Sequence, residues 1–371
     1  MLLANQPLRE MTSRERFLRL ASNEPTDRGL FFSEHFWGET IARWQEEGMP
    51  CDYDFEFDFD FHVGSLGALG VNVGYFPPFE QEMVADEDST QLIRDEYGII
   101  KRVSKGHSGM PQFVEFPVHD RSSWEKIKSR LDPNPDISAR FPQEWAQRVE
   151  TLKQAHYPII FTGGHLTGFF SFLRELTGDR VYYLFHDDPD LVREMLDFQV
   201  YRLTTFIKRI SEEIQLDGQF IWEDMCYKTG PLIGPPMFRE FILEPYQRTI
   251  EASKSCGMRA FYVDSDGNLD ALIPLWLEAG VNMMEPFEVA AGMDVVKVKE
   301  TYGDKLVVVG GIDKRALAAD FEAIDQEIER IRPAYEMGGC IPCLDHSAPP
   351  NISWENYLYY LEKRKRLVGK E

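Results

Sequence analysis

Short runs of β-branched and aromatic residues alternate with longer amphipathic stretches over the second two-thirds of the chain. Runs of this length that end in polar residues are typical of buried strands, and a 3.6-residue period between them predicts helices. We expect strands over 158–162, 219–222, 259–263, 281–284, 306–309 and 340–344. We expect helices over 190–214, 236–256, 269–278, 293–302 and 316–332.

Repeated strand–helix alternation predicts a parallel sheet with helices around it. At 371 residues, a closed (β/α)8 barrel of the TIM type is the leading α/β architecture. A doubly wound open sheet is the alternative, and its glycine-rich phosphate turn should follow the first strand. The sequence GGHLTG at 163–168 does not match that fingerprint.

The clearest internal break lies at 132–135, where two prolines end a helical pattern. We expect residues 1–135 to be an irregular lid segment that packs on the barrel and supplies part of it, and 136–371 to be the main barrel. Acidic and aromatic residues alternate over 51–61, and this period of two favours a strand. A wall of the ligand pocket, with Phe57 in it, is the other interpretation of this stretch.

Nearly every predicted strand ends in polar, mostly acidic residues. In a barrel these ends share one face, where active sites are built. The alternative is that acids such as Asp266, Asp294 and Asp313 only cap the helices or form the turns that follow. The strand-end residues are His165, Glu223, Asp224, Asp264, Asp266, Glu285, Asp313, Asp345 and His346.

So many carboxylates around one cavity cannot all stay ionised unless a cation lies among them or some of their pKa values rise. A divalent metal is one such cation, and an ammonium-type substrate is another. Asp264 and Asp266 would supply two oxygen ligands from one strand end, and His346 a nitrogen from another. This donor set suits zinc, manganese or iron. Alternatively, His346 hydrogen-bonds Asp345 or a loop carbonyl.

Other motifs are weaker or absent. Cys340 and Cys343 have the spacing of a zinc or redox pair, but no second pair exists, and a structural role in the apolar run is favoured. The sequence has no Gly-x-Ser-x-Gly elbow and no Walker loop, which argues against an α/β-hydrolase and a P-loop NTPase. Five cysteines form no disulfide framework and fit a reducing cytoplasm.

Charge excludes two classes of partner. The chain has 40 Lys and Arg against 62 Asp and Glu, a formal net charge of −22, and no basic cluster that could meet a phosphate backbone. We therefore expect neither a nucleic-acid nor a membrane-surface partner. No apolar run approaches the roughly 20 residues that a membrane span needs, and the first residues lack an apolar signal core.

Short motifs recur along essentially the whole chain: MTSRER at 11–16, EPTDR at 24–28, GPLI at 230–233, FREFI at 238–242, DSDGN at 264–268, GGIDK at 310–314 and IPCLDHSAPP at 341–350. Together these motifs resemble those of the uroporphyrinogen decarboxylase-like superfamily. The resemblance implies a (β/α)8 barrel with a decorated N-terminal segment. It also implies one of two chemistries: metal-free decarboxylation of uroporphyrinogen, or methyl transfer between a methyl-corrinoid protein and a thiol or other acceptor at a zinc site.

The sequence departs from both patterns. The decarboxylases grip substrate carboxylates with an Arg-rich N-terminal motif, whereas 31–37 reads FFSEHFW. The His-x-Cys stretch of the methyltransferases falls on 264–267 and their distant Cys falls near His346, so both sulfur ligands are replaced. Asp and His ligands would make a harder, more electrophilic metal site than thiolates.

The leading hypothesis is a metal-dependent methyltransferase of this superfamily that acts on a small methylated substrate or a corrinoid protein, with zinc as the first candidate metal. Metal ligands are then Asp264, Asp266 and His346, proton handling or charge stabilisation falls to Glu223, Asp224 and Glu285, and substrate contacts come from His165, Tyr227, Phe57 and Asp313. One alternative is a metal-free decarboxylase or lyase on a small carboxylated substrate, with Arg102 or Arg174 in its pocket. Another is a non-catalytic corrinoid- or amine-binding protein. A homodimer is an expectation from the resemblance alone.

Overall fold

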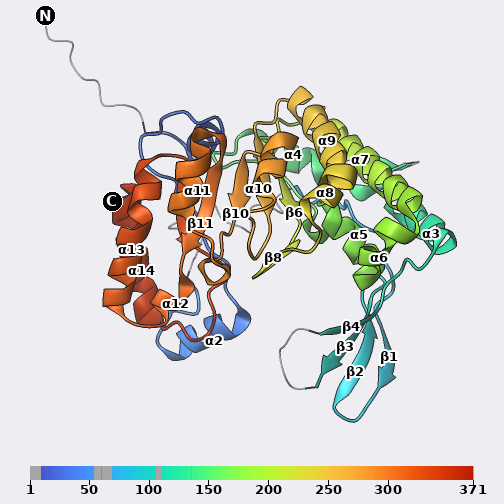
Figure 1. The fold of residues 1–371 in the computed structure, drawn as a ribbon, viewed down its shortest axis with the longest axis horizontal. Coiled ribbons are helices and arrows are strands. Elements are labelled where there is room, and N and C mark those ends of the chain that lie inside the picture. The colour runs from blue at the N-terminus through green and yellow to red at the C-terminus, as the bar shows by residue number, and fades with distance from the viewer. Residues whose placement is uncertain (1–9, 54–59, 61–68, 106–110, 135, 371) are drawn as a thin grey trace, which may run out of the picture.

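Six parallel strands form the centre of the computed structural model, which describes residues 10–53, 60, 69–105, 111–134 and 136–370 (Figure 1). All six predicted strands are present, each within three residues of its expected bounds. Their order in the sheet is β12-β11-β10-β9-β6-β5. The bounds are β5 (Ile160–Phe161), β6 (Gly218–Trp222), β9 (Ala260–Asp264), β10 (Met283–Glu285), β11 (Val307–Ile312) and β12 (Cys340–Leu344).

The inside of this curved sheet is an apolar cluster to which strands and N-terminal segment both contribute. Tyr262, Met283 and Val309 point inward from the strands, and Leu30 and Phe32 pack against the same cluster. Phe36 also forms a parallel bridge with Ala348, just after β12. Residues of the N-terminal segment therefore belong to the same apolar cluster as the inward side chains of the strands.

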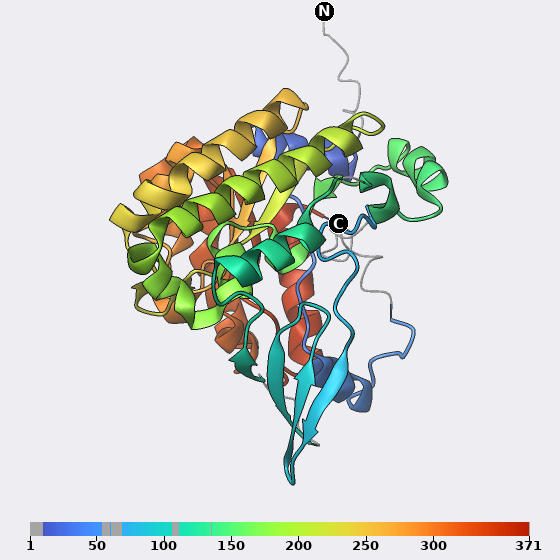
Figure 2. The same ribbon diagram turned by 90° about the vertical axis from the view of Figure 1, so that its right-hand side faces the viewer.

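Helices cover the outside of the strands, as the amphipathic periods predict. In Figure 2, α7 and α9 lie side by side across this outer face. The predicted helix at 316–332 is wrong in one respect: it is two helices, because the Asp320 side chain accepts from Ala323 N and starts a new helix. The main helices are α4 (Trp145–Lys153), α5 (Phe170–Thr177), α6 (Val181–Asp187), α7 (Pro189–Ser211), α9 (Leu243–Ser255), α10 (Ile273–Ala279), α11 (Val295–Tyr302), α12 (Lys314–Leu317), α13 (Phe321–Glu336) and α14 (Trp354–Val368).

The N-terminal third adds α1 (Ser13–Ala21), α2 (Gly38–Glu46) and α3 (Arg121–Leu131), together with a four-stranded antiparallel sheet. This sheet projects from the rest of the molecule in both views (Figures 1 and 2). The alternating stretch 51–61 lies mostly outside the described residues, and Phe57 with it. The strands of the projecting sheet are β1 (Glu82–Asp86), β2 (Thr90–Arg94), β3 (Ile100–Ser104) and β4 (Gln112–Glu115).

An ion-pair network fixes the N-terminal segment before it enters the barrel. Arg16 pairs with Asp27 at 2.8 Å, and Arg28 pairs with Asp60 through both guanidinium nitrogens, at 2.5 and 2.7 Å. Asp60 also accepts from Phe31 N at 2.8 Å. Burial alone would raise the pKa of Asp60, but the bonds from Arg28 and Phe31 outweigh it and lower that pKa.

This network predicts a specific loss of stability in acid. A carboxylate whose pKa is lowered by folding stabilises the protein above its unfolded pKa of about 4, and this stabilisation is lost as the pH falls further. We expect wild type to be more stable than Asp60→Asn near neutral pH, with a gap that narrows by on the order of 1 kcal/mol between about pH 5 and pH 3. Urea unfolding at several pH values measures this gap, with Asp270→Asn, an exposed acid, as the control. A gap independent of pH would contradict the prediction.

Candidate functional site

A cavity of about 470 Å³ opens among the carboxyl ends of the strands. Its wall combines residues after β5, at the ends of β6, β9, β10 and β12, and from 32–35 of the N-terminal segment. Its acidic members are Glu34, Asp224, Asp264, Asp266 and Glu285. Lysine and arginine do not occur among the described residues that line it.

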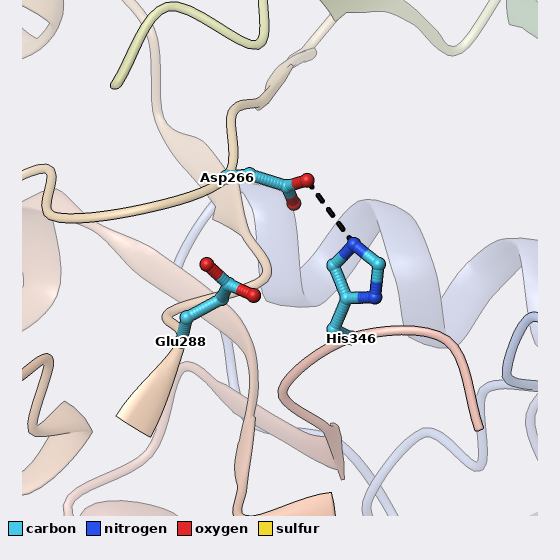
Figure 3. A group of neighbouring side chains, drawn as sticks. All are labelled: Asp266, Glu288 and His346. Carbon is cyan, nitrogen blue, oxygen red and sulfur yellow. Dashed lines mark hydrogen bonds and ion pairs between the residues drawn. The ribbon is translucent and has the colours of Figure 1, made fainter. Parts of the chain in front are cut away.

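Three metal-type donors converge at one side of this cavity (Figure 3). Asp266, Glu288 and His346 each offer one ligand atom, and these atoms lie within 4.8 Å of one another. Nε2 of His346 is 3.1 Å from Oδ2 of Asp266. The hydrogen bond to Asp266 raises the pKa of His346, although burial opposes this. One imidazole nitrogen and two carboxylates are a donor set that fits zinc, manganese or iron.

The surroundings of Glu288 explain its place in this group. The backbone bends sharply after β10, where Phe287 has φ 59°, and this bend turns Glu288 toward the end of β9. Gly267 N donates to Glu288 Oε2 at 3.0 Å, while Lys314 Nζ lies 3.8 Å from Oε1. Gly310 permits the bend, because a Cβ there would lie 2.0 Å from the Pro286 carbonyl oxygen.

Asp264, predicted as the third ligand, lies outside this group of three donors, and Glu288 is its third member instead. The Asp264 carboxylate lines the cavity, with the acidic groups of Glu285, Asp266 and Asp224 nearby. Burial and these like charges raise the pKa of Asp264 well above its usual range. The Tyr262 hydroxyl donates to Glu285, and burial raises the pKa of Glu285. Both carboxylates belong to residues that line the cavity.

His165 and Asp224 line the cavity as predicted for strand-end residues. The His165 ring stacks on Trp222 with centroids 4.1 Å apart and an interplanar angle of 14°. Burial and the charges of Lys101 and Arg174 lower the pKa of His165, so the stacked ring is neutral near pH 7. Arg174 donates to the Asp224 carboxylate at 3.0 Å and to its carbonyl at 2.7 Å, which neutralises this acid.

Glu223 has a structural position. It is fully buried and does not line the cavity. Its carboxylate accepts from Phe169 N at 2.7 Å, Ser171 N at 2.9 Å and the Tyr246 hydroxyl at 2.6 Å. These bonds secure the start of α5, so we leave Glu223 out of the proposed catalytic group.

The side chains of Asp313 and Asp345 also accept hydrogen bonds from backbone amides. Asp313 accepts from Arg315 N at 2.9 Å and pairs with that side chain at 2.7 Å, as a cap of α12. The buried Asp345 accepts from Val289 N at 2.9 Å and Lys314 N at 3.1 Å. Neither lines the cavity. The capping interpretation therefore describes Asp313 better than a substrate contact does.

Tyr227, predicted as a substrate contact, belongs to the hairpin of β7 (Cys226–Tyr227) and β8 (Gly230–Pro231), where it is 67% exposed and does not line the cavity.

Cys343 lines the cavity and Cys340 lies in the core, and burial raises the pKa of both thiols. None of the described helices has the length and apolar character that a bilayer span requires.

Comparison with known proteins finds the same family as the sequence motifs. The family model of uroporphyrinogen decarboxylase (URO-D) matches residues 102–367. No curated protein matches significantly. Among solved structures, a methyltransferase from Methanosarcina mazei has a TM-score of 0.60 at 15% identity, over 96% of this chain and 99% of that chain. A B12-independent methionine synthase from Shewanella sp. W3-18-1 has a TM-score of 0.38 at 13% identity, over 60% and 65% of the two chains.

At these identities the likeness to solved structures bears on the fold alone. The Methanosarcina likeness covers both chains almost completely and, together with the family match, confirms the predicted α/β class and TIM-barrel type. Among the described residues, six strands of this barrel are hydrogen-bonded to one another. The family match covers more than half of the sequence and confirms the resemblance carried by its motifs: the chain belongs to the uroporphyrinogen decarboxylase family.

Proposed function

We propose that this chain is a metal-dependent methyltransferase that acts on a small methylated substrate. One observation carries the proposal: Asp266, Glu288 and His346, from three different strand ends, place their donor atoms within 4.8 Å of one another beside the cavity. Zinc is the first candidate for this donor set. A corrinoid protein is the proposed partner in the methyl exchange, and a homodimer stays an expectation.

A divalent metal bound by these residues would supply Lewis-acid chemistry at the methyl acceptor or at the atom that loses the methyl group. The chain's own residues prepare the site. Before a metal binds, the contact between His346 and Asp266 holds these two side chains together, and the Gly267 amide orients the Glu288 carboxylate. Asp264 and Glu285 face the cavity, where their carboxylates favour positive charge on a methylated substrate. The acid–base role predicted for Asp224 is limited by its ion pair with Arg174.

A decarboxylase acting on an anionic substrate fits this cavity less well. Such an enzyme needs a cationic side chain against the substrate carboxylate, and the described lining has neither lysine nor arginine. Arg174 is committed to Asp224, while Arg102 lies on β3 and pairs with Glu87 at 3.5 Å. The acidic residues at the strand ends would also repel an anionic substrate.

Metal content tests the proposal directly. After dialysis against buffer with trace zinc, wild type should retain about one ion per chain by elemental analysis. Asp266→Asn and His346→Ala each remove one of three ligands, so we expect retention to fall at least about tenfold. Asp224→Asn is the matched control, because this acid lines the same cavity but is not a ligand; its metal content should equal that of wild type.

Two results would contradict the metal site: absence of bound metal in wild type, or equal content in wild type and both ligand variants. A methyl-transfer assay then separates an enzyme from a binding protein. If the protein is an enzyme, His346→Ala loses turnover of the methylated substrate. A non-catalytic binding protein would show no turnover in wild type either.

A further inference from the structure

The cavity has a second part beside the three metal-type donors, built from aromatic rings and two carboxylates. Phe220 and Trp222 reach it from β6, and Phe32 from the N-terminal segment. Asp264 and Glu285 come from the ends of the adjacent strands β9 and β10, where they are register partners. This part of the cavity therefore combines apolar surface with two neighbouring carboxyl groups.

Neither Asp264 nor Glu285 has a counter-ion among the described residues. The side chain of Asp264 accepts neither a hydrogen bond nor an ion pair within the described ranges, and Glu285 is bonded only by the neutral hydroxyl of Tyr262. The three other acids of the wall differ in this respect. Glu34 is paired with the buried Arg364, Asp224 with Arg174, and Asp266 with His346. The chain neutralises its structural acids and leaves these two open to the cavity.

The three donors next to this part do not account for the two acids. Asp266, Glu288 and His346 meet without Asp264 or Glu285, so a metal held there leaves the pair to another ligand. His165 stacks on one face of Trp222, and the Arg174 guanidinium, 5.7 Å from the centre of that ring, is paired with Asp224. Aromatic rings together with carboxylates that have no counter-ion are surroundings in which proteins bind alkylated ammonium groups. A cavity of about 470 Å³ is of a size that takes a small molecule.

We propose that this part of the cavity, formed by Trp222, Phe220, Asp264 and Glu285, binds a methylated ammonium group of the substrate. The assignment of that group as the methyl donor rests on the proposed function. The substrate class is then a small quaternary or tertiary methylammonium compound.

The reaction of such a donor balances without a proton. The breaking C–N bond leaves its electron pair on nitrogen, so a quaternary ammonium departs as a neutral tertiary amine. The methyl carbon bonds to a nucleophile that supplies an electron pair, namely a thiolate or the reduced corrinoid of a partner protein. Since the amine has lost its charge, Asp264 and Glu285 hold it less strongly than they held the substrate. The carboxylates therefore serve substrate binding.

Calorimetric titration with choline and with 3,3-dimethylbutan-1-ol tests this inference, because the two probes share a shape and differ in the charged atom. We expect choline to bind wild type at least about tenfold more tightly. Asp264→Asn should remove most of this preference, and Trp222→Leu should weaken choline binding. Asp270→Asn, an exposed acid outside the cavity, is the control and should bind as wild type does.

Equal affinity for the two probes, no binding of choline at millimolar concentration, or an unchanged preference in Asp264→Asn would each overturn the inference. Titrations of metal-free and zinc-loaded protein keep its outcome apart from that of the proposed function. Choline preference in a protein without metal or methyl transfer would leave the inference standing and remove the proposed function. A zinc-loaded, methyl-transferring protein without charge preference would do the reverse.

Discussion

Arg364→Met is expected to lower the free energy of unfolding by about 3–5 kcal/mol, because it leaves a buried charge without its partner. Arg364 of α14 is fully buried and pairs with Glu34, which is 5% exposed, and donates to the carbonyl of Phe32. Tyr357 and Tyr360 donate to the same carboxylate at 3.0 and 2.6 Å, but neither hydroxyl carries a charge. Urea unfolding followed by circular dichroism measures the loss.

A double variant separates a lost charge pair from lost packing. Glu34→Leu combined with Arg364→Met removes both charges, so much of the stability lost in the single variant should return. Arg366→Met is the matched control, because its pair with Glu362 on the same helix is exposed, and such pairs contribute at most about 1 kcal/mol. A single variant within about 1 kcal/mol of wild type would contradict the prediction. Since Glu34 lines the cavity, the pair also fixes the cavity wall.

The sequence could not reveal this pair, because its members are 330 residues apart and neither lies in a motif with a known spacing. In the sequence, the segment 31–37 that contains Glu34 indicates only that the Arg-rich motif of the decarboxylases is absent. The six strands, in contrast, could be predicted from the sequence. Each is buried on both faces and is therefore a short apolar run that ends at polar residues, a pattern that can be recognised from neighbouring residues alone. The barrel follows from this local pattern repeated six times.

The projecting sheet was missed for the opposite reason. Its strands β1 and β4 are almost wholly exposed and β2 is half-buried throughout, so they lack the alternation of apolar and polar positions that predicts a strand. The interpretation of the strand-end acids depended on where each backbone turns. Glu288 joins Asp266 and His346 only because the chain bends at Phe287, and a bend of this kind leaves no periodic signal.

The strand-end acids fall into two classes that a stability experiment distinguishes. Glu223→Ala is expected to lower the free energy of unfolding by about 3–5 kcal/mol, because it leaves two backbone amides and the Tyr246 hydroxyl unsatisfied in the core and opens a void. Asp264→Asn should instead keep or raise stability, by up to about 2 kcal/mol, since it removes the cost of burying this carboxyl group among like charges.

Urea unfolding of both variants, with wild type measured alongside, gives the comparison, and choline titration of Asp264→Asn completes it. A residue whose removal stabilises the fold while it weakens ligand binding is placed for function, whereas one whose removal only destabilises is placed for folding. Equal destabilisation by the two substitutions would contradict this division. It would also mean that Asp264 is held by the fold as Glu223 is, and that its carboxylate is not open to a cationic ligand.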